Sequence, residues 1–257
     1  MQLLVSVRSA AEAMAALDGG ADIIDAKDPR AGALGAVSID ALHDIHAAVA
    51  GRRAVTAAIG DASDEAAIAA TACAFADAGT RFVKIGFGGI RSAARIESLA
   101  AAAQRGAVAG AAASAVVLVA YADDDSRTSR TPAALVEIAA RVGAGGVLLD
   151  TADKRGPGLT RLLDQRTLAA WVARAHDAGL FVALAGKLAA DDLPVVRDTG
   201  ADIAGVRGAA CDGGRTGRIS AELVRALRLE SGRVRLQPDR DPAVRLQPDR
   251  GPGSVRL

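Results

Sequence analysis

Aromatic residues are scarce in this sequence, whose 257 residues include four Phe, one Tyr and one Trp. A surface that binds nucleic acid by stacking bases on aromatic rings is therefore not expected. The net charge of +1 likewise gives no general attraction to nucleic acid or to an anionic membrane. Hydrophobic residues still make up 51% of the chain, so a large core has to be built from Ala, Val, Leu and Ile.

Cysteine and histidine are also rare. Cys73 and Cys211 are far apart and match no metal-binding or redox spacing. His43 and His46 lie in an expected helix, where a solvated helix face is a simpler interpretation than a metal site. The three consecutive Asp residues at 123–125 could hold a divalent cation, but a solvated loop is again the simpler interpretation. We therefore expect no metal and no organic cofactor.

Long apolar runs are missing as well. The first apolar stretch is short and soon meets Arg8 and Glu12, which is unlike a signal peptide. The longest uncharged stretch, 106–122, is marginal for a membrane span and is better explained as the end of a helix followed by a buried strand. We expect a cytoplasmic protein that binds neither a membrane nor nucleic acid.

Lysine is the scarce member of the basic residues. Of the 31 Lys and Arg residues only four are lysines, namely Lys27, Lys84, Lys154 and Lys187. Arginine thus serves wherever a solvated positive charge is enough. A site that needs a neutral amine cannot use arginine, because its guanidinium stays protonated. The positions of the four lysines are therefore informative.

Short β-rich runs alternate with Ala-rich helical stretches over residues 1–230. Strands are expected at 3–7, 22–27, 54–60, 82–87, 115–121, 146–152, 181–187 and 202–208. Helices are expected at 9–19, 38–50, 64–79, 91–105, 131–142, 166–178, 189–199 and 220–229. Eight strands, each followed by a helix, predict an α/β protein with one (β/α)8 TIM barrel. The alternative is an open doubly wound sheet, which usually has fewer strands, and no Gly-x-Gly-x-x-Gly motif opens a helix here.

The segment at 231–257 has a different composition. It repeats VRLQPDR at 234–240 and 244–250 and is rich in Pro, Arg and Asp. We expect a short disordered tail. A tail that binds an acidic partner is the less favoured alternative, because charged runs are usually only solvated.

The four lysines fall at or just after expected strands two, four, six and seven, near the barrel face that carries the active site in such folds. Asp25 and Lys27 are two residues apart on one strand and so point to the same side, and Asp150 ends another strand. Crowding and desolvation lower the pKa of one amine, and a neutral amine can attack a carbonyl carbon to form an imine. A neighbouring lysine or aspartate would then move protons.

The pattern therefore predicts Schiff-base chemistry on a small carbonyl compound, carried by Lys27, Lys84, Asp25, Asp150 and Lys154. The alternative interpretation is that Asp25–Lys27 and Asp150–Lys154 are structural ion pairs at the rim of the barrel.

Two glycine-bearing segments predict a phosphate site. Gly186 and Lys187 end strand seven, and Gly205, Arg207 and Gly208 end strand eight. Barrels often bind phosphate with the loops after these two strands, through backbone N–H groups. The alternative is that the glycines only make tight turns.

These residues lie in segments that are similar to a known family. LLVSVRSAAEAMAALDGGADIIDAKDPRAGALGA at the N-terminus resembles the (5-formylfuran-3-yl)methyl phosphate synthases, also called 4-(hydroxymethyl)-2-furancarboxaldehyde-phosphate synthases. The likeness continues through FVKIGFGG, GVLLDTADKRGPGL, FVALAGKL and ADIAGVRGAAC and covers residues 1–230. DAKDPRAGALGA is the most specific of these segments.

The resemblance implies a lyase that joins two molecules of glyceraldehyde 3-phosphate, with loss of phosphate and water, in methanofuran biosynthesis and one-carbon metabolism. It implies a Schiff base on Lys27 and proton transfer by Lys84, with Asp25, Asp150 and Lys154 matching the other charges of the family's active site. Two other functions stay open: a class I aldolase or phosphosugar lyase of another pathway, and a non-catalytic barrel that binds a phosphorylated metabolite. A homo-oligomer is also left open.

Overall fold

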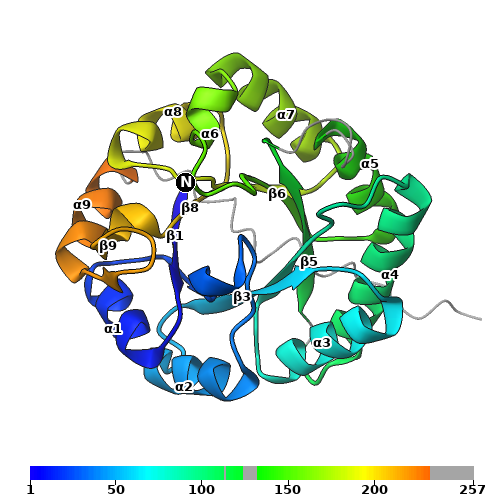
Figure 1. Cartoon of the computed structure of the whole chain (residues 1–257), viewed down its shortest axis with the longest axis horizontal. Coiled ribbons are helices and arrows are strands. Elements are labelled where there is room, and N and C mark those ends of the chain that lie inside the picture. The colour runs from blue at the N-terminus through cyan, green and yellow to red at the C-terminus, as the bar shows by residue number, and fades with distance from the viewer. Residues whose placement is uncertain (113, 124–131, 232–257) are drawn as a thin grey trace, which may run out of the picture.

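The computed structural model describes residues 1–112, 114–123 and 132–231 (Figure 1). All but the first residue of the expected tail lie outside these described residues, and so do Asp124 and Asp125 of the acidic run.

Eight parallel strands close into a barrel in chain order, with β8 pairing back to β1. The strands are β1 (Gln2–Val7), β2 (Ile23–Ala26), β3 (Ala54–Asp61), β4 (Phe82–Gly86), β5 (Ala115–Tyr121), β6 (Gly146–Asp150), β7 (Phe181–Leu184) and β8 (Ile203–Val206). Figure 1 shows the helices as a ring outside the strands. The predicted (β/α)8 barrel is confirmed.

The helices alternate with the strands. They are α1 (Ala10–Asp18), α2 (Ile39–Val49), α3 (Glu65–Asp77), α4 (Ala93–Ala109), α5 (Pro132–Val142), α6 (Leu159–Leu162), α7 (Gln165–Asp177), α8 (Leu193–Asp198) and α9 (Ala221–Ser231). Short 3₁₀ turns are η1 (Pro29–Ala31), η2 (Ala190–Asp192) and η3 (Gly208–Ala210). A small antiparallel hairpin of β9 (Cys211–Asp212) and β10 (Arg218–Ile219) lies between β8 and α9.

Short polar residues fix where several helices begin. The side chains of Ser38, Asp64 and Asp164 each accept a hydrogen bond from a backbone N–H in the first turn of α2, α3 and α7. Glycines with a positive φ end α3 and α7, at Gly79 and Gly179. These residues are the caps that the DAGT and DAGL segments indicate.

Three strands end earlier than expected. β2 stops at Ala26, β7 at Leu184 and β8 at Val206. Lys27 and Lys187 therefore belong to loops rather than to strands. An apolar pattern cannot show where the backbone ladder stops when the next residues are buried as well.

Other departures are local. The helix expected at 189–199 is divided into η2 and α8, where Pro194 stands in the first turn of α8. The short helix α6 and the β9–β10 hairpin were not expected, because elements of two to four residues carry no periodic signal.

The inside of the barrel is apolar at one end and polar at the other. Leu4, Ile23 and Phe82 point inward near the strand starts, where the Phe82 and Phe181 rings lie 5.3 Å apart. Residues two positions further along the same strands also point inward. Those residues are Ser6, Asp25 and Lys84, each at most 2% exposed. The fold thus builds an apolar plug beneath a polar layer at the carboxyl ends of the strands.

Candidate active site

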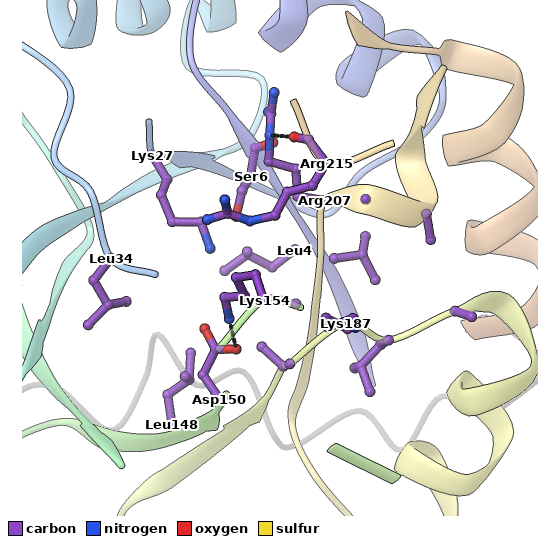
Figure 2. Close-up of a pocket in the computed structure, with 18 of the residues that line it drawn as sticks. Leu4, Ser6, Lys27, Leu34, Leu148, Asp150, Lys154, Lys187, Arg207 and Arg215 are labelled. Carbon is purple, nitrogen blue, oxygen red and sulfur yellow. Dashed lines mark hydrogen bonds and ion pairs between the residues drawn. The ribbon is translucent and has the colours of Figure 1, made fainter. Parts of the chain in front are cut away.

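A cavity of about 340 Å³ opens at the carboxyl ends of the strands (Figure 2). It is lined by Leu4, Ser6, Lys27, Leu34, Lys84, Leu148, Asp150, Lys154, Ala185, Gly186, Lys187, Leu188, Ala189, Gly205, Val206, Arg207, Gly208, Ala209, Gly214 and Arg215. All four lysines of the chain are among these residues. The expected site residues thus gather in one place, with Asp25 directly beneath the cavity as the partner of Lys84.

Asp25 is fully buried, and polar groups surround its carboxylate. Ser6 and Thr56 stand in register with it on the two flanking strands, and their hydroxyls donate hydrogen bonds of 2.8 Å to its two oxygens. Lys84 completes the set with an ion pair to Oδ1. A buried charge pair is tolerated only when its remaining polar atoms are satisfied in this way. Ser6 and Thr56 escaped the sequence analysis because single hydroxyl residues in a strand carry no pattern.

Asp150 and Lys154 form a second pair, 2.7 Å apart. The Asp150 carboxylate also accepts a hydrogen bond of 2.7 Å from the backbone N–H of Thr151, and the Lys154 amine donates to the Thr151 carbonyl. Burial by itself would raise the pKa of Asp150, but the positive charges of Lys154 and Lys27 outweigh it and hold that pKa below its usual value. Asp150 is therefore a carboxylate at neutral pH.

Lys27 differs from both. Among residues 1–112, 114–123 and 132–231, no carboxylate pairs with its amine. Its backbone N–H is held by the Val7 carbonyl at 2.8 Å, and its side chain enters the cavity (Figure 2). Burial lowers the pKa of Lys27 from 10.5 to about 8; the charge of Asp150 opposes this shift and that of Lys84 adds to it. A sizeable fraction of Lys27 is thus neutral near physiological pH.

The loop after β7 has the geometry of an anion site. Gly186 and Lys187 have positive φ values of 104° and 58°. A Cβ at Gly186 would lie 3.0 Å from Thr151 Cγ2, so this turn leaves no room for a side chain. The amides of residues 186–188 donate no hydrogen bond to the described part of the chain. Consecutive free amides in such a turn form a concave nest that suits an anion.

The loop after β8 faces this nest. The amides of Gly208 and Ala209, at the start of η3, also donate to no described residue. Gly205 lies in the strand itself, where a Cβ would approach Ala185 Cβ to 3.2 Å. Its role is thus to leave space between the two strand ends, while Gly208 offers an amide.

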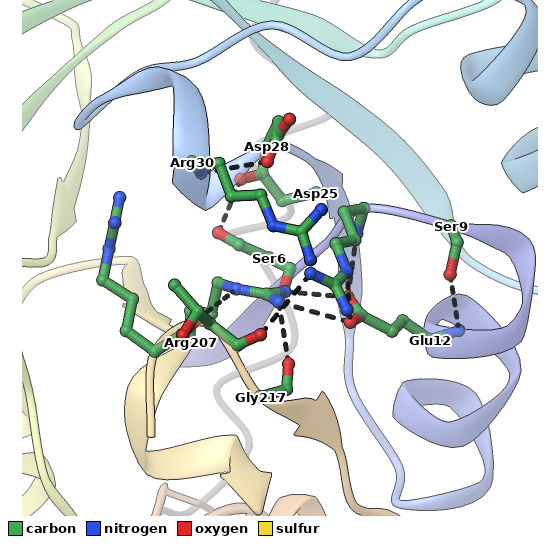
Figure 3. Close-up of polar contacts among 11 residues, drawn as sticks. Ser6, Ser9, Glu12, Asp25, Asp28, Arg30, Arg207 and Gly217 are labelled. Atoms are coloured by element: carbon green, nitrogen blue, oxygen red, sulfur yellow. Dashed lines mark hydrogen bonds and ion pairs between the residues drawn. The ribbon is translucent and has the colours of Figure 1, made fainter. Parts of the chain in front are cut away.

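Arg207 is engaged elsewhere. Its guanidinium donates to both carboxylate oxygens of Glu12 at 2.8 and 3.2 Å, and to the carbonyls of Ser6, Arg215 and Gly217 (Figure 3). These contacts use all five N–H donors of an arginine. Arg207 borders the cavity, but the geometry describes a clamp between α1 and the hairpin, and its expected part in binding phosphate stays a prediction.

Arg215 is a cavity residue that the sequence analysis missed. It stands in the β9–β10 turn, and its guanidinium donates to the carbonyls of Pro29 and Gly32 in the loop after β2. The only sequence signal was the Gly-Gly-Arg-Thr-Gly turn at 213–217. The position of that turn over the barrel depends on the hairpin, which is too short to predict.

Two further expectations concern metals and membranes. No group of three or more His, Cys, Asp or Glu in the described residues could hold a metal ion. Asp123 instead accepts hydrogen bonds from the backbone N–H groups of Ala152 and Asp153 at 2.6 and 2.7 Å. Of the helices within the described ranges, none is both long and apolar enough to cross a membrane.

Solved structures resemble the chain in fold alone. A 2-keto-gulonate-type entry named KGPDC from Streptococcus mutans aligns with a TM-score of 0.63 at 14% identity, covering 90% of this chain and 96% of that one. A 3-hexulose-6-phosphate synthase aligns with a TM-score of 0.57 at 23% identity, covering 90% and 99%.

Relatives of closer sequence carry one name. The (5-formylfuran-3-yl)methyl phosphate synthase of Methanosarcina barkeri is 37% identical over 228 residues, which covers 88% of this chain and 97% of the relative. The enzyme of that name from Methanocaldococcus jannaschii is 36% identical over 231 residues, covering 89% and 98%. The sequence profile described as 4-HFC-P synthase matches residues 3–228. The chain therefore belongs to the (5-formylfuran-3-yl)methyl phosphate synthase family of barrel enzymes.

Proposed function

We propose that this protein condenses two molecules of glyceraldehyde 3-phosphate into (5-formylfuran-3-yl)methyl phosphate, with loss of phosphate and water, through a Schiff base on Lys27. The observation that carries the proposal is the contrast among the cavity lysines. Lys84 and Lys154 each have a carboxylate partner, whereas Lys27 has none among the described residues and has a pKa of about 8. Family membership supplies the substrate and the product.

The first step follows from the free amine. The Lys27 nitrogen attacks the aldehyde carbon of one substrate, and the carbinolamine that forms loses water to give a protonated imine. The proton that water needs on leaving comes from a neighbouring cation. Lys154 suits this role because Asp150 holds its amine at the cavity wall, 2.7 Å away.

Carbon–carbon bond formation follows from the positive imine. It withdraws electrons from the adjacent C–H bond, so a base can remove that proton and leave an enamine, whose carbon attacks the aldehyde of the second molecule. The Asp25–Lys84 pair lies beneath the same cavity and can accept or return protons through Lys84. Cyclisation and elimination of phosphate and water break carbon–oxygen bonds, which makes the overall reaction that of a lyase.

The phosphate groups bind at the rim. The free amides at 186–188 and at Gly208 and Ala209 form one anion site, with the Lys187 amine at its edge. Lys187 donates to the Gly156 carbonyl, which keeps its charge beside the cavity. These residues hold the substrate so that its aldehyde reaches Lys27.

Incubation of the purified protein with glyceraldehyde 3-phosphate tests the proposal. The expected result is a new ultraviolet chromophore, a product with the mass of the furan phosphate, and released phosphate. Normal consumption of substrate without a furan chromophore would indicate an aldolase of another pathway. No reaction, together with no borohydride-trapped adduct on Lys27, would leave a binding barrel in place of an enzyme with this activity.

A further inference from the structure

The cavity is lined by six cationic side chains, which divide into two equal groups. Lys84, Lys154 and Arg207 are paired with Asp25, Asp150 and Glu12. Lys27, Lys187 and Arg215 pair with no carboxylate in the part of the chain that the structure describes. Lys27 has a role in the proposed chemistry, which leaves two cations without a counter-charge. They lie on different walls of the cavity.

Lys187 belongs to the wall formed after β7, beside the amide nest. Arg215 starts near the loop after β8, where its Cα lies 3.8 Å from the place of a Cβ on Gly208, but its guanidinium ends at the carbonyls of Pro29 and Gly32. Figure 2 shows the Arg215 side chain extended across the cavity in the direction of Lys27, while the guanidinium of Arg207 turns away from it. The Arg215 charge therefore stands well away from the nest.

The Arg215 guanidinium is held in place without being saturated. Its contacts to Pro29 and Gly32 use one N–H on each terminal nitrogen. Nε and one N–H on each terminal nitrogen donate to no described residue, in contrast to the five used donors of Arg207. A positioned guanidinium with free donors matches the oxygens of a phosphate in a bidentate manner.

We propose that Arg215 forms a second anion subsite, which binds the phosphate of the second triose phosphate while the amide nest binds the phosphate of the first. This inference rests on the proposed function, because that reaction brings two phosphate groups into a cavity of about 340 Å³. Two dianions in so small a space repel each other strongly, so each needs its own cation at a separate wall. Lys27 enters the cavity between the two seats, where both aldehydes can meet.

Replacement of the charge tests the subsite. In R215Q, borohydride should still trap one triose phosphate on Lys27, because the nest and the amine are unchanged. The KM for furan formation should rise by about 10- to 100-fold, the usual effect of losing a charge-assisted pair of hydrogen bonds. R215K keeps the charge but not the fork and should lie between. R218Q is the matched control, since Arg218 is exposed in the same hairpin and does not line the cavity.

A structural role for Arg215 gives a different pattern, because the same side chain also joins the hairpin to the loop after β2. Loss of adduct and turnover together in R215Q, with no recovery on adding guanidinium ion, would overturn the subsite. An unchanged KM in R215Q would overturn it as well. Recovery of turnover by added guanidinium would support it.

Equilibrium dialysis with radiolabelled inorganic phosphate separates this inference from the proposed function. The wild-type chain should bind two phosphate ions and R215Q one, whatever reaction the protein performs. If the wild type makes no furan but this difference is found, the subsite stands and the proposed reaction fails. Equal phosphate binding by the two proteins would overturn the subsite even if the furan is formed.

Discussion

The two ends of the barrel treat charge in opposite ways. At the amino end, Asp22 accepts a hydrogen bond from the Leu3 N–H at 2.9 Å and pairs with Arg228 at 3.2 Å. Asp202 there accepts from the Val182 N–H at 2.8 Å and contacts His176 at 2.9 Å. At the carboxyl end, three cations of the cavity have no carboxylate among the described residues. One end satisfies its charges, and the other holds some of them ready for a substrate.

The same contrast exists within the cavity. Lys84 is 2% exposed and keeps a carboxylate beside it, whereas Lys27 enters the cavity without one. Burial alone therefore does not decide how a lysine behaves; the partner within reach decides it. The comparison teaches that a reactive amine is made by withholding a counter-ion that its neighbours receive.

The largest expected effect comes from removing the reactive amine while keeping its charge. K27R should lower the rate of furan formation by a factor on the order of 10⁴ to 10⁶, as the loss of a catalytic nucleophile does in other enzymes, because a guanidinium does not form the imine. Mass spectrometry after borohydride reduction should find no adduct. K187R, changed at the exposed rim, should still give one. A K27R protein with near-normal turnover would remove Lys27 from the mechanism.

The next effect is on stability. D25N leaves the buried Lys84 charge without its partner, and breaking a buried pair in this way costs about 3–5 kcal/mol. Urea unfolding should show this loss as a lower midpoint. D153N is the matched control: Asp153 pairs with Arg155 at 3.7 Å on the surface, where the cost should stay below about 1 kcal/mol. Equal losses in the two variants would contradict the contrast drawn here.

A smaller effect depends on pH. The pKa of Lys27 is about 8 in the folded chain and near 10.5 when unfolded, so the unfolded state binds more protons between these values. The destabilisation by Lys27 is fully present below about pH 8 and is relieved as the pH rises towards 10.5. K27M should therefore be more stable than the wild type at pH 7, with a gap that narrows by pH 10. A gap that does not change with pH in urea titrations would argue against a lowered pKa.

The smallest effect belongs to the amino end. H176A removes one hydrogen bond to Asp202, which should cost about 1 kcal/mol in urea unfolding. Turnover and borohydride trapping should not change, because His176 lies on α7 at the end remote from the cavity. A loss of turnover without a loss of stability would show that the two ends are coupled.

The sequence predicted the repeated units better than the parts between them. Eight strands and most helices follow from apolar periodicity and from caps such as Asp64 and Gly79, which act locally. Lysine scarcity pointed to the cavity, because lysine is chemically distinct from arginine. Four of the five residues assigned to the chemistry line the cavity, and the fifth, Asp25, pairs with Lys84 beneath it.

The remaining features depend on contacts between distant residues. Ser6 and Thr56 matter only because closure of the sheet places them on either side of Asp25. Arg207 and Arg215 look alike in the sequence, yet one faces Glu12 and the other crosses the cavity. No local pattern could separate two arginines whose roles depend on a two-residue strand and its turn.

The clamp at Arg207 also bears on the order in which the molecule is made. It joins Ser6 and Glu12, which leave the ribosome early, to Arg215 and Gly217, which leave late. Until the last strand arrives, the Glu12 carboxylate has no guanidinium to receive it, and the hairpin has no anchor over the cavity. The enclosed surroundings that make Lys27 reactive therefore form only in a nearly finished chain, so a nascent or truncated chain does not present that amine to the aldehydes of the cell.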